Sequence, residues 1–354
     1  MFIVLPHAFA LRLDLSEDYL TYFKARYAGY LHRKYENGLF GSISYGDNLL
    51  QSIHEVIRPP VGRGENIFLF DISQNTLTAN FHDIFVEPLC IEISNNFNKA
   101  FLGNFIEYLY YLYLKKMGKT VIHCSSFELN DEVVLCPAWR NTGKTNLLIN
   151  ALSVGALYLA DDWVICDRVG KIEVFPKSIN IEHYNVRSLF DWNFECTEAK
   201  LLSEIESFIE SSKYFNRDAK TEILSGAQFF IPLDLIPKSK MASEHQPLGV
   251  DKIYWLNWVS RSKPTVDFYN VTALQIQKHI LGTRRLEHYP FELLMSVNPD
   301  INIQDISYFD ELEATGLANM LSECNQLIRA DLSGQDQTPI VLERILSEQG
   351  LSVR

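Results

Sequence analysis

The stretch that decides the fold is Glu132-Val-Val-Leu-Cys-Pro-Ala-Trp-Arg-Asn-Thr-Gly-Lys-Thr145, which continues as Asn-Leu-Leu-Ile-Asn-Ala-Leu-Ser153. Its apolar start predicts a buried strand over 132–136, and the apolar-rich segment 144–153, closed by Gly155, predicts a helix. The residues between them fit the pattern G-x-x-x-x-G-K-[ST], except that Ala138 replaces the first glycine. A strand, this loop and a helix together are typical of a phosphate-binding loop.

Each part of that loop has a distinct expected role. Backbone amides and the helix amino terminus face an oligophosphate, Lys144 reaches its outer oxygens, and Thr145 binds Mg²⁺. The methyl group of Ala138 is costly only if the backbone there needs a positive φ. The predicted nucleotide-binding residues are Ala138, Arg140, Asn141, Thr142, Gly143, Lys144, Thr145 and Asn146.

Two adjacent carboxylates follow the next predicted strand. The apolar segment 156–160 leads directly into Asp161 and Asp162. With the strand at 132–136 and the helix at 144–153, it predicts a βαβ-like unit. A carboxylate at the end of a buried strand beside a phosphate loop is where the Mg²⁺ of a nucleotide is held. A predicted hairpin, 163–167 with 172–175, comes next.

The order of these motifs resembles a known family. A segment His123-Cys-Ser-Ser126 lies 21 residues before Lys144, and the loop, helix, Asp161-Asp162 pair and hairpin follow it. This arrangement resembles the catalytic core of the HPr kinase/phosphorylase-like group, whose phosphate loop is related to that of phosphoenolpyruvate carboxykinases. The resemblance covers roughly residues 119–182. It implies an α/β fold with a P-loop kinase core of the HPr kinase-like type and an additional strand-containing amino-terminal domain.

The resemblance also implies an activity: ATP-dependent phosphorylation of a hydroxyl, on a serine of a peptide or protein or on a small metabolite. Lys144 then contacts the β- and γ-phosphates, and Thr145 with Asp162 holds Mg²⁺. Asp161 is the expected base for the acceptor hydroxyl, and His123 lies near the transferring group. The sequence alone does not decide which of the two aspartates takes which role.

The remaining chain is organised around that core. The expected domains are an α+β domain at 1–95, the nucleotide-binding core at 96–270 and a helical region packed on it at 271–354. Helical spacing predicts a helix within 96–117, and 252–258 predicts another strand. The segment 197–222 predicts either a flap containing a helix or a packed surface helix. Arg284-Arg285 is interpreted as a solvated pair at a helix end, with an anion-binding role as the alternative.

Composition narrows the function further. The 354 residues carry a net charge of −12, which disfavours nucleic-acid and membrane-surface partners. Six scattered cysteines and the absence of a long apolar segment predict a cytoplasmic protein. Two alternative functions stay open: a non-catalytic nucleotide sensor or scaffold, which Ala138 makes credible, and a nucleoside-triphosphate hydrolase. A homo-oligomer is also possible.

Overall fold

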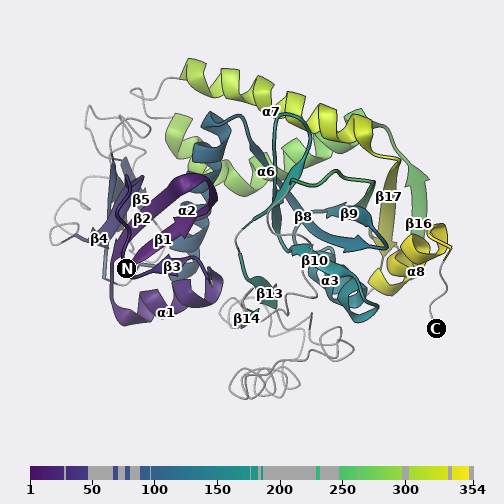
Figure 1. The fold of residues 1–354 in the computed structure, drawn as a ribbon, viewed down its shortest axis with the longest axis horizontal. Helices are drawn as coiled ribbons and strands as arrows, with labels where there is room; N and C mark the ends of the chain where they lie inside the picture. The colour runs from purple at the N-terminus through teal and green to yellow at the C-terminus, as the bar shows by residue number, and fades with distance from the viewer. Residues whose placement is uncertain are drawn as a thin grey trace. The chain divides into compact units, whose positions relative to one another are not determined.

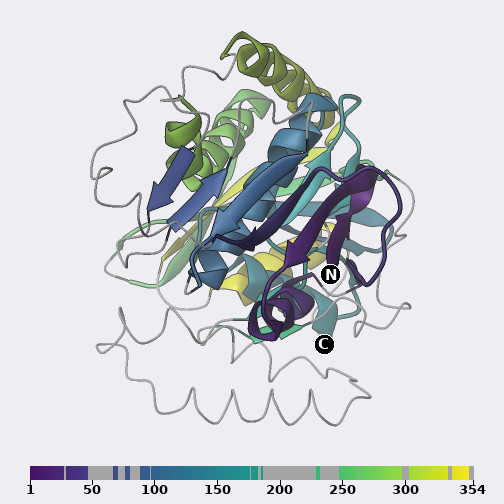
Figure 2. The ribbon, with the colours of Figure 1, turned by 90° about the vertical axis from the view of Figure 1, so that its left-hand side faces the viewer.

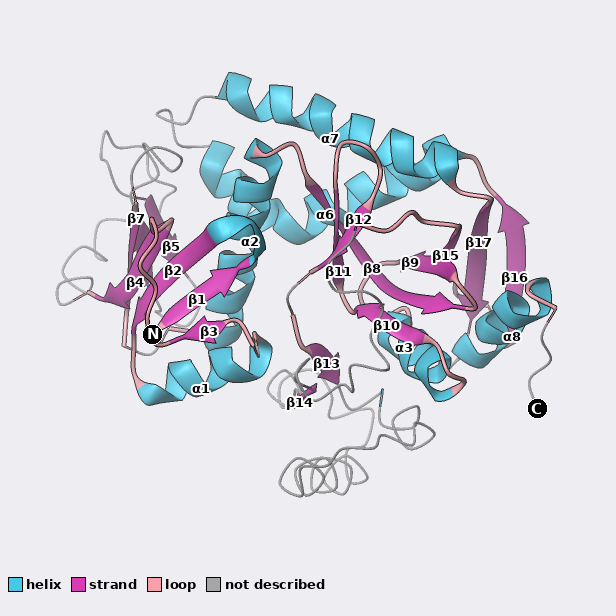
Figure 3. Cartoon of the chain, viewed as in Figure 1, coloured by secondary structure: helices cyan, strands magenta, loops and turns pink. Residues whose placement is uncertain are grey.

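The computed structural model describes residues 1–27, 29–46, 67–70, 76–79, 88–95, 97–175, 177–181, 185, 229–231, 247–261, 263–296, 303–333 and 337–350. The chain is a mixed α/β protein (Figure 3). Two compact units divide it: the first holds residues 1–120 and 284–314, and the second holds 121–283 and 315–354. The predicted segment 197–222 lies outside the described residues.

The first unit is built on a mixed sheet of seven described strands in the order β3-β1-β2-β4-β7-β6-β5. The strands β1 and β2 form an antiparallel pair, whereas β2, β4 and β7 run parallel. The strands are β1 (Phe2–Leu5), β2 (Phe9–Asp14), β3 (Leu31–His32), β4 (Gly41–Tyr45), β5 (Ile67–Phe70), β6 (Thr76–Ala79) and β7 (Leu89–Ile93).

Two helices, α1 (Glu17–Arg26) and α2 (Lys99–Lys116), complete the core of this unit (Figure 2). The side chain of Asn98 caps α2 by accepting a hydrogen bond from the backbone of Phe101. The helix packs on the sheet through aromatic contacts, of which Phe9 with Tyr110 is one, with ring centroids 5.2 Å apart. The strand-rich region and the helix within 96–117 are therefore confirmed.

The second unit is built on a sheet in the order β12-β11-β8-β9-β15-β17-β16, with β10 also pairing β8. The strands are β8 (Thr120–Leu129), β9 (Glu132–Pro137), β10 (Leu157–Ala160), β11 (Trp163–Cys166), β12 (Ile172–Val174), β15 (Lys252–Trp258), β16 (Thr265–Asn270) and β17 (Gln326–Ser333). A short pair, β13 (Ile179–Ile181) with β14 (Phe229–Ile231), is separate from this sheet.

The predicted βαβ-like unit is present, with one strand inserted. Helix α3 (Lys144–Ser153) connects β9 to β10, and both strands pair antiparallel with β8, which lies between them. On the other side of β9, strands β15 and β17 run parallel to it. The carboxyl ends of β9, β15 and β17 therefore lie at one edge of the sheet, where open α/β sheets bind ligands.

Helices cover both faces of this second sheet (Figure 1). Parts of α6 (Ala273–Ser296) and α7 (Ile303–Glu323) pack on one face, where Ile276 and Leu317 join the cluster that contains Ile253. Helices α3 and α8 (Thr338–Glu348) lie side by side on the other face, where Tyr254 of β15 contacts Glu348. The alternation of Ile253 and Tyr254 follows from the two-residue period of a strand.

The structure divides the chain differently from the predicted bounds 1–95, 96–270 and 271–354. Helices α6 and α7 each contribute to both units, since the divisions fall at 283/284 and 314/315. The expected helical region also contains β17, whose alternating sequence forms an interior strand between β15 and β16. None of the helices in the described part of the chain has a stretch long and apolar enough to cross a bilayer.

Candidate active site

The loop between β9 and α3 bends back through two residues in the left-handed backbone region. Asn141 has a φ of 60° and Gly143 a φ of 99°. Asparagine and glycine are the residues that tolerate this conformation best. Gly143 is required for a second reason: a Cβ added to it would lie 2.7 Å from the Cγ2 atom of Thr338 in α8. Both the local backbone conformation and the packing of α8 therefore favour glycine at position 143.

Ala138 fits the loop without the strain that its replacement of glycine suggests. It is not among the described residues with a positive φ, and its side chain is fully buried. Its backbone amide donates to the carbonyl of His123 at 3.3 Å, and it forms a parallel bridge with Leu256. The residue therefore continues the β9 ladder, where an alanine is as suitable as a glycine.

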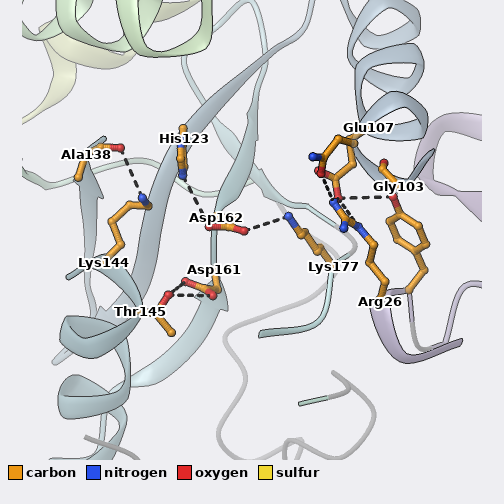
Figure 4. Close-up of polar contacts among 12 residues, drawn as sticks. Arg26, Gly103, Glu107, His123, Ala138, Lys144, Thr145, Asp161, Asp162 and Lys177 are labelled. Carbon is orange, nitrogen blue, oxygen red and sulfur yellow. Dashed lines mark hydrogen bonds and ion pairs between the residues drawn. The ribbon is translucent and has the colours of Figure 1, made fainter. Parts of the chain in front are cut away.

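The two residues that carry the motif's chemistry begin α3 (Figure 4). Lys144 is buried, and its Nζ donates to the carbonyl oxygens of Trp139 and Ala138 at 3.2 and 3.5 Å. The hydroxyl of Thr145 donates to Asp161, with its Oγ1 lying 3.1 and 3.2 Å from the two carboxylate oxygens. The structure therefore brings Thr145 to Asp161, whereas the resemblance implied a pair with Asp162.

Asp162 faces a different set of groups (Figure 4). Its Oδ2 accepts from Nζ of the buried Lys177 at 2.9 Å, and its Oδ1 lies 3.6 Å from Nε2 of His123. The His123 ring stacks on Trp163, with centroids 5.0 Å apart. Asp162 has a φ of 70°, and its carbonyl accepts the amide of Cys124 at 2.9 Å. This left-handed turn points successive carboxylates to different partners.

The two carboxylates differ in proton affinity for physical reasons. Burial, and then repulsion from Asp162, raises the pKa of Asp161 to about 7 against the opposing pull of Lys144. Burial also acts to raise the pKa of Asp162, but the charge of Lys177 and the contact with His123 outweigh it and hold that pKa well below its ordinary value. Asp162 is therefore ionised at neutral pH, whereas Asp161 gains and loses its proton near pH 7.

The other predicted loop residues lie as follows. Arg140 and Asn141 are exposed, and the hydroxyl of Thr142 donates to the carbonyl of Trp139 at 2.6 Å, which closes the loop. Asn146 is buried and accepts from the side chain of Asn185 at 2.7 Å. Arg140 and Asn141 therefore face outward, whereas Asn146 is held by a neighbouring residue.

Sequence reasoning missed three residues of this site: Lys177, Trp163 and Thr338. Lys177 comes directly after the predicted hairpin and returns to the paired carboxylates, so a lysine at that turn was the available signal. Thr338 belongs to a helix nearly two hundred residues after the loop, and no local pattern relates the two.

Arg284 was also interpreted incorrectly as solvated. It is 2% exposed and forms an ion pair with the equally buried Glu313, both within the first unit. Arg285 is exposed, as expected.

The donor set suits Mg²⁺ bound together with phosphates. Within the described residues no group of three His, Cys, Asp or Glu side chains is arranged to hold a metal ion. Magnesium bound to nucleotides commonly takes only one or two carboxylates and completes its shell with water and phosphate oxygens. The Thr145 hydroxyl and the Asp161 carboxylate, both oxygen donors within 3.2 Å of each other, fit that requirement.

Comparison with known proteins adds no assignment: no protein-family model matches the chain, and no curated protein matches its sequence.

Proposed function

We propose that this protein is a Mg²⁺- and ATP-dependent phosphotransferase that acts on a hydroxyl group. The observation that carries the proposal is the arrangement at the end of the loop, where Lys144 and the Thr145–Asp161 pair lie at the start of α3 and the Asp162–Lys177 pair lies beside them. On this proposal the second unit is a P-loop core of the HPr kinase-like type, and the first unit is its additional domain.

Phosphate binding follows from the loop and from α3. The amides at the helix amino terminus and the ammonium group of Lys144 offer positive potential to a polyanion. Lys144 now donates to two loop carbonyls, at 3.2 and 3.5 Å, which are weak substitutes for phosphate oxygens. Binding a nucleotide would exchange these contacts for charge-assisted ones.

The aspartate roles follow from their neighbours. Thr145 occupies the position that contacts Mg²⁺ in phosphate loops, so Asp161, bonded to it, is the carboxylate that would hold the ion with it. When bound, Mg²⁺ supplies charge neutralisation on the β- and γ-phosphates. This assignment exchanges the roles that the resemblance implied, with Asp162 in place of Asp161 at the acceptor.

Asp162 is then the group that orients the acceptor. Its ionised carboxylate accepts the hydroxyl proton as the acceptor oxygen attacks the γ-phosphorus, and the bond from that phosphorus to the β,γ-bridging oxygen breaks to release ADP. Lys177 keeps Asp162 ionised through their 2.9 Å contact, and His123 lies 3.6 Å from the same carboxylate. Phosphoryl transfer depends mainly on such positioning and charge.

The proposal includes a cellular compartment for the protein and a class of phosphoryl acceptor. Cys90, Cys124, Cys136 and Cys324 are free thiols, which supports a reducing, cytoplasmic setting. The acceptor is a small molecule or a peptide that carries a hydroxyl.

The experiment is to incubate the protein with Mg²⁺ and γ-³²P-labelled ATP and a panel of hydroxyl-bearing metabolites and serine peptides, and to separate the products. Label on an acceptor supports the proposal, with Lys144→Ala as the inactive control. Label released only as inorganic phosphate identifies a hydrolase, and nucleotide bound without turnover identifies a sensor.

A further inference from the structure

A row of aromatic and basic side chains lies on the second sheet beside the phosphate loop. Trp255 of β15 is in register with Arg329 of β17, which is in register with Tyr269 of β16. The guanidinium carbon of Arg329 lies 5.2 Å from the Trp255 ring centroid and 5.8 Å from that of Tyr269. The three side chains therefore share the face of the sheet that α6 covers.

His279 of α6 joins this row. Its imidazole stacks on the Trp255 ring, with centroids 4.3 Å apart and planes at 27°. Asp331 accepts hydrogen bonds from Nε and Nη2 of Arg329 at 2.6 and 2.7 Å. These two bonds fix the guanidinium group but do not use its Nη1 atom. The Trp255 indole therefore contacts both the His279 imidazole and the Arg329 guanidinium.

Two polar atoms in this group are buried without a hydrogen bond. Neither Nε1 of Trp255 nor Nε2 of His279 has a partner among the described residues. An indole N–H is a donor only, and burying a donor unpaired costs stability. Native proteins rarely leave such groups unsatisfied, and two in one stacked pair are groups that a hydrogen-bonding ligand would satisfy.

The group is next to the proposed reaction centre. Ala138, the first loop residue, forms a bridge with Leu256, which follows Trp255. Burial, and then the neighbouring His123, Lys144 and Arg329, lower the pKa of His279 to about 4. The imidazole is therefore neutral at pH 7, and two cations lie near it: Lys144, and Arg329 in its ion pair with Asp331. Such surroundings favour a ligand that is an acceptor of hydrogen bonds and negatively charged.

We propose that Trp255, His279 and Arg329 bind an oxyanion of the phosphoryl acceptor, so that the substrate is a hydroxy compound carrying a carboxylate or a phosphate. This inference rests on the proposed function. The Trp255 Nε1–H donates to the oxyanion, the Nε2–H tautomer of His279 adds a second donor, and Arg329 contributes charge.

The test uses three probes that share hydroxyl groups and differ in charge: glycerate, glycerol 3-phosphate and glycerol. The full-length protein is first saturated with Mg²⁺ and ADP, so that the phosphate loop is occupied. Binding is followed by calorimetry and by the tryptophan indole N–H signals in a ¹H–¹⁵N spectrum. The Trp255 signal is identified as the one lost in Trp255→Phe.

We expect one of the two anions, and not glycerol, to shift the Trp255 signal, and the stronger of them identifies the oxyanion. Trp255→Phe keeps the stacked ring but removes the donor, so it should weaken that binding about tenfold or more, as the loss of a hydrogen bond to a charged group does. His279→Phe should weaken it in the same direction. Trp258→Phe is the matched control, because Trp258 ends the same strand but is 52% exposed.

Three results would overturn the inference: glycerol binding as well as the anions, unchanged binding in Trp255→Phe, or no shift of the Trp255 signal with either anion. Repeating the titration without nucleotide separates this inference from the proposed function. If ADP does not bind but an anion still shifts the Trp255 signal, the proposed function fails and the oxyanion site stands.

Discussion

The hydroxyl of Thr145 lies 3.1 and 3.2 Å from the two carboxylate oxygens of Asp161, whereas Asp162, the next residue, contacts Lys177 and His123. This division separates two carboxylates that are adjacent in sequence. It gives Asp161 the neighbour that a metal ligand needs and Asp162 the neighbours that keep a carboxylate charged.

Replacing each aspartate by asparagine should have different effects. Asp162→Asn should keep Mg²⁺-dependent ADP binding while phosphoryl transfer falls by roughly 10²–10⁴, because the amide cannot accept the hydroxyl proton. Asparagine also tolerates the left-handed backbone at this position. Asp161→Asn should instead remove the Mg²⁺ dependence of ADP binding. Calorimetry with and without Mg²⁺, beside the transfer assay, measures both; the opposite pattern would restore Asp161 as the base.

Asp161 should make stability depend on pH when metal is absent. Its pKa is raised from 3.8 to about 7 on folding, so between these values the folded chain binds more protons than the unfolded one. The contribution of Asp161 to the free energy of unfolding therefore decreases as pH rises from about 4 to 7, by at most ~4 kcal/mol at ~1.4 kcal/mol per pKa unit. The lowered pKa of Asp162 acts only below this window.

Urea unfolding in EDTA at several pH values, compared between the wild type and Asp161→Asn, measures that contribution. The stability of the wild type relative to the variant should fall across the window. A constant difference from pH 4 to 8 would show that Asp161 is not held protonated by its surroundings.

Gly143 and Thr338 should be energetically coupled. Gly143→Ala imposes a left-handed φ on alanine, at ~1–2 kcal/mol, and also places a methyl group against Cγ2 of Thr338. Thr338→Ser removes that Cγ2 but keeps the hydroxyl that accepts from Asn150 at 3.2 Å. Gly143→Ala should therefore cost less in the Thr338→Ser background.

A double-mutant cycle by urea unfolding measures this coupling, expected at roughly 0.5–3 kcal/mol for residues in contact. Thr338→Val is the control, since it keeps a methyl group at that place and loses the hydroxyl. Additive effects of Gly143→Ala and Thr338→Ser would mean that α8 does not contact the loop.

Ala138→Gly should lower stability without improving nucleotide binding. The native φ of Ala138 is one that alanine adopts freely, so glycine only adds freedom to the unfolded chain and removes a buried methyl group. The expected loss is about 1 kcal/mol. Apo unfolding and ADP affinity measured on the same variant separate the two effects; clearly tighter ADP binding would show that the alanine strains the loop.

The sequence predicted local elements better than long-range partners. The bounds of α3 and β15 agree with the predicted 144–153 and 252–258, because an apolar period and a glycine define them locally. Strand β17 was missed within the region expected to be helical, since its status depends on β15 and β16 pairing with it from far away in sequence.

The same limit applied within the site. The motif predicted Lys144 and Thr145 at the start of a helix, and they are there. It did not predict that Thr145 would meet Asp161 and not Asp162, because the left-handed turn at Asp162 decides which way each carboxylate points. Trp255 likewise becomes a neighbour of the site only through the packing of a distant segment, whereas Lys177 reaches Asp162 from 15 residues further along the chain.

The central claim is that the loop from Ala138 to Thr145 binds the phosphates of a nucleotide, and calorimetric titration of Mg²⁺–ADP tests it most directly. The wild type should bind, Lys144→Ala should lose most of that affinity, and the exposed Lys263→Ala should bind as the wild type does. Thermal stability should follow, since a ligand at 100 times its Kd adds ~2.7 kcal/mol. Equal binding of Mg²⁺–ADP by the wild type and Lys144→Ala, or none by the wild type, would contradict the account.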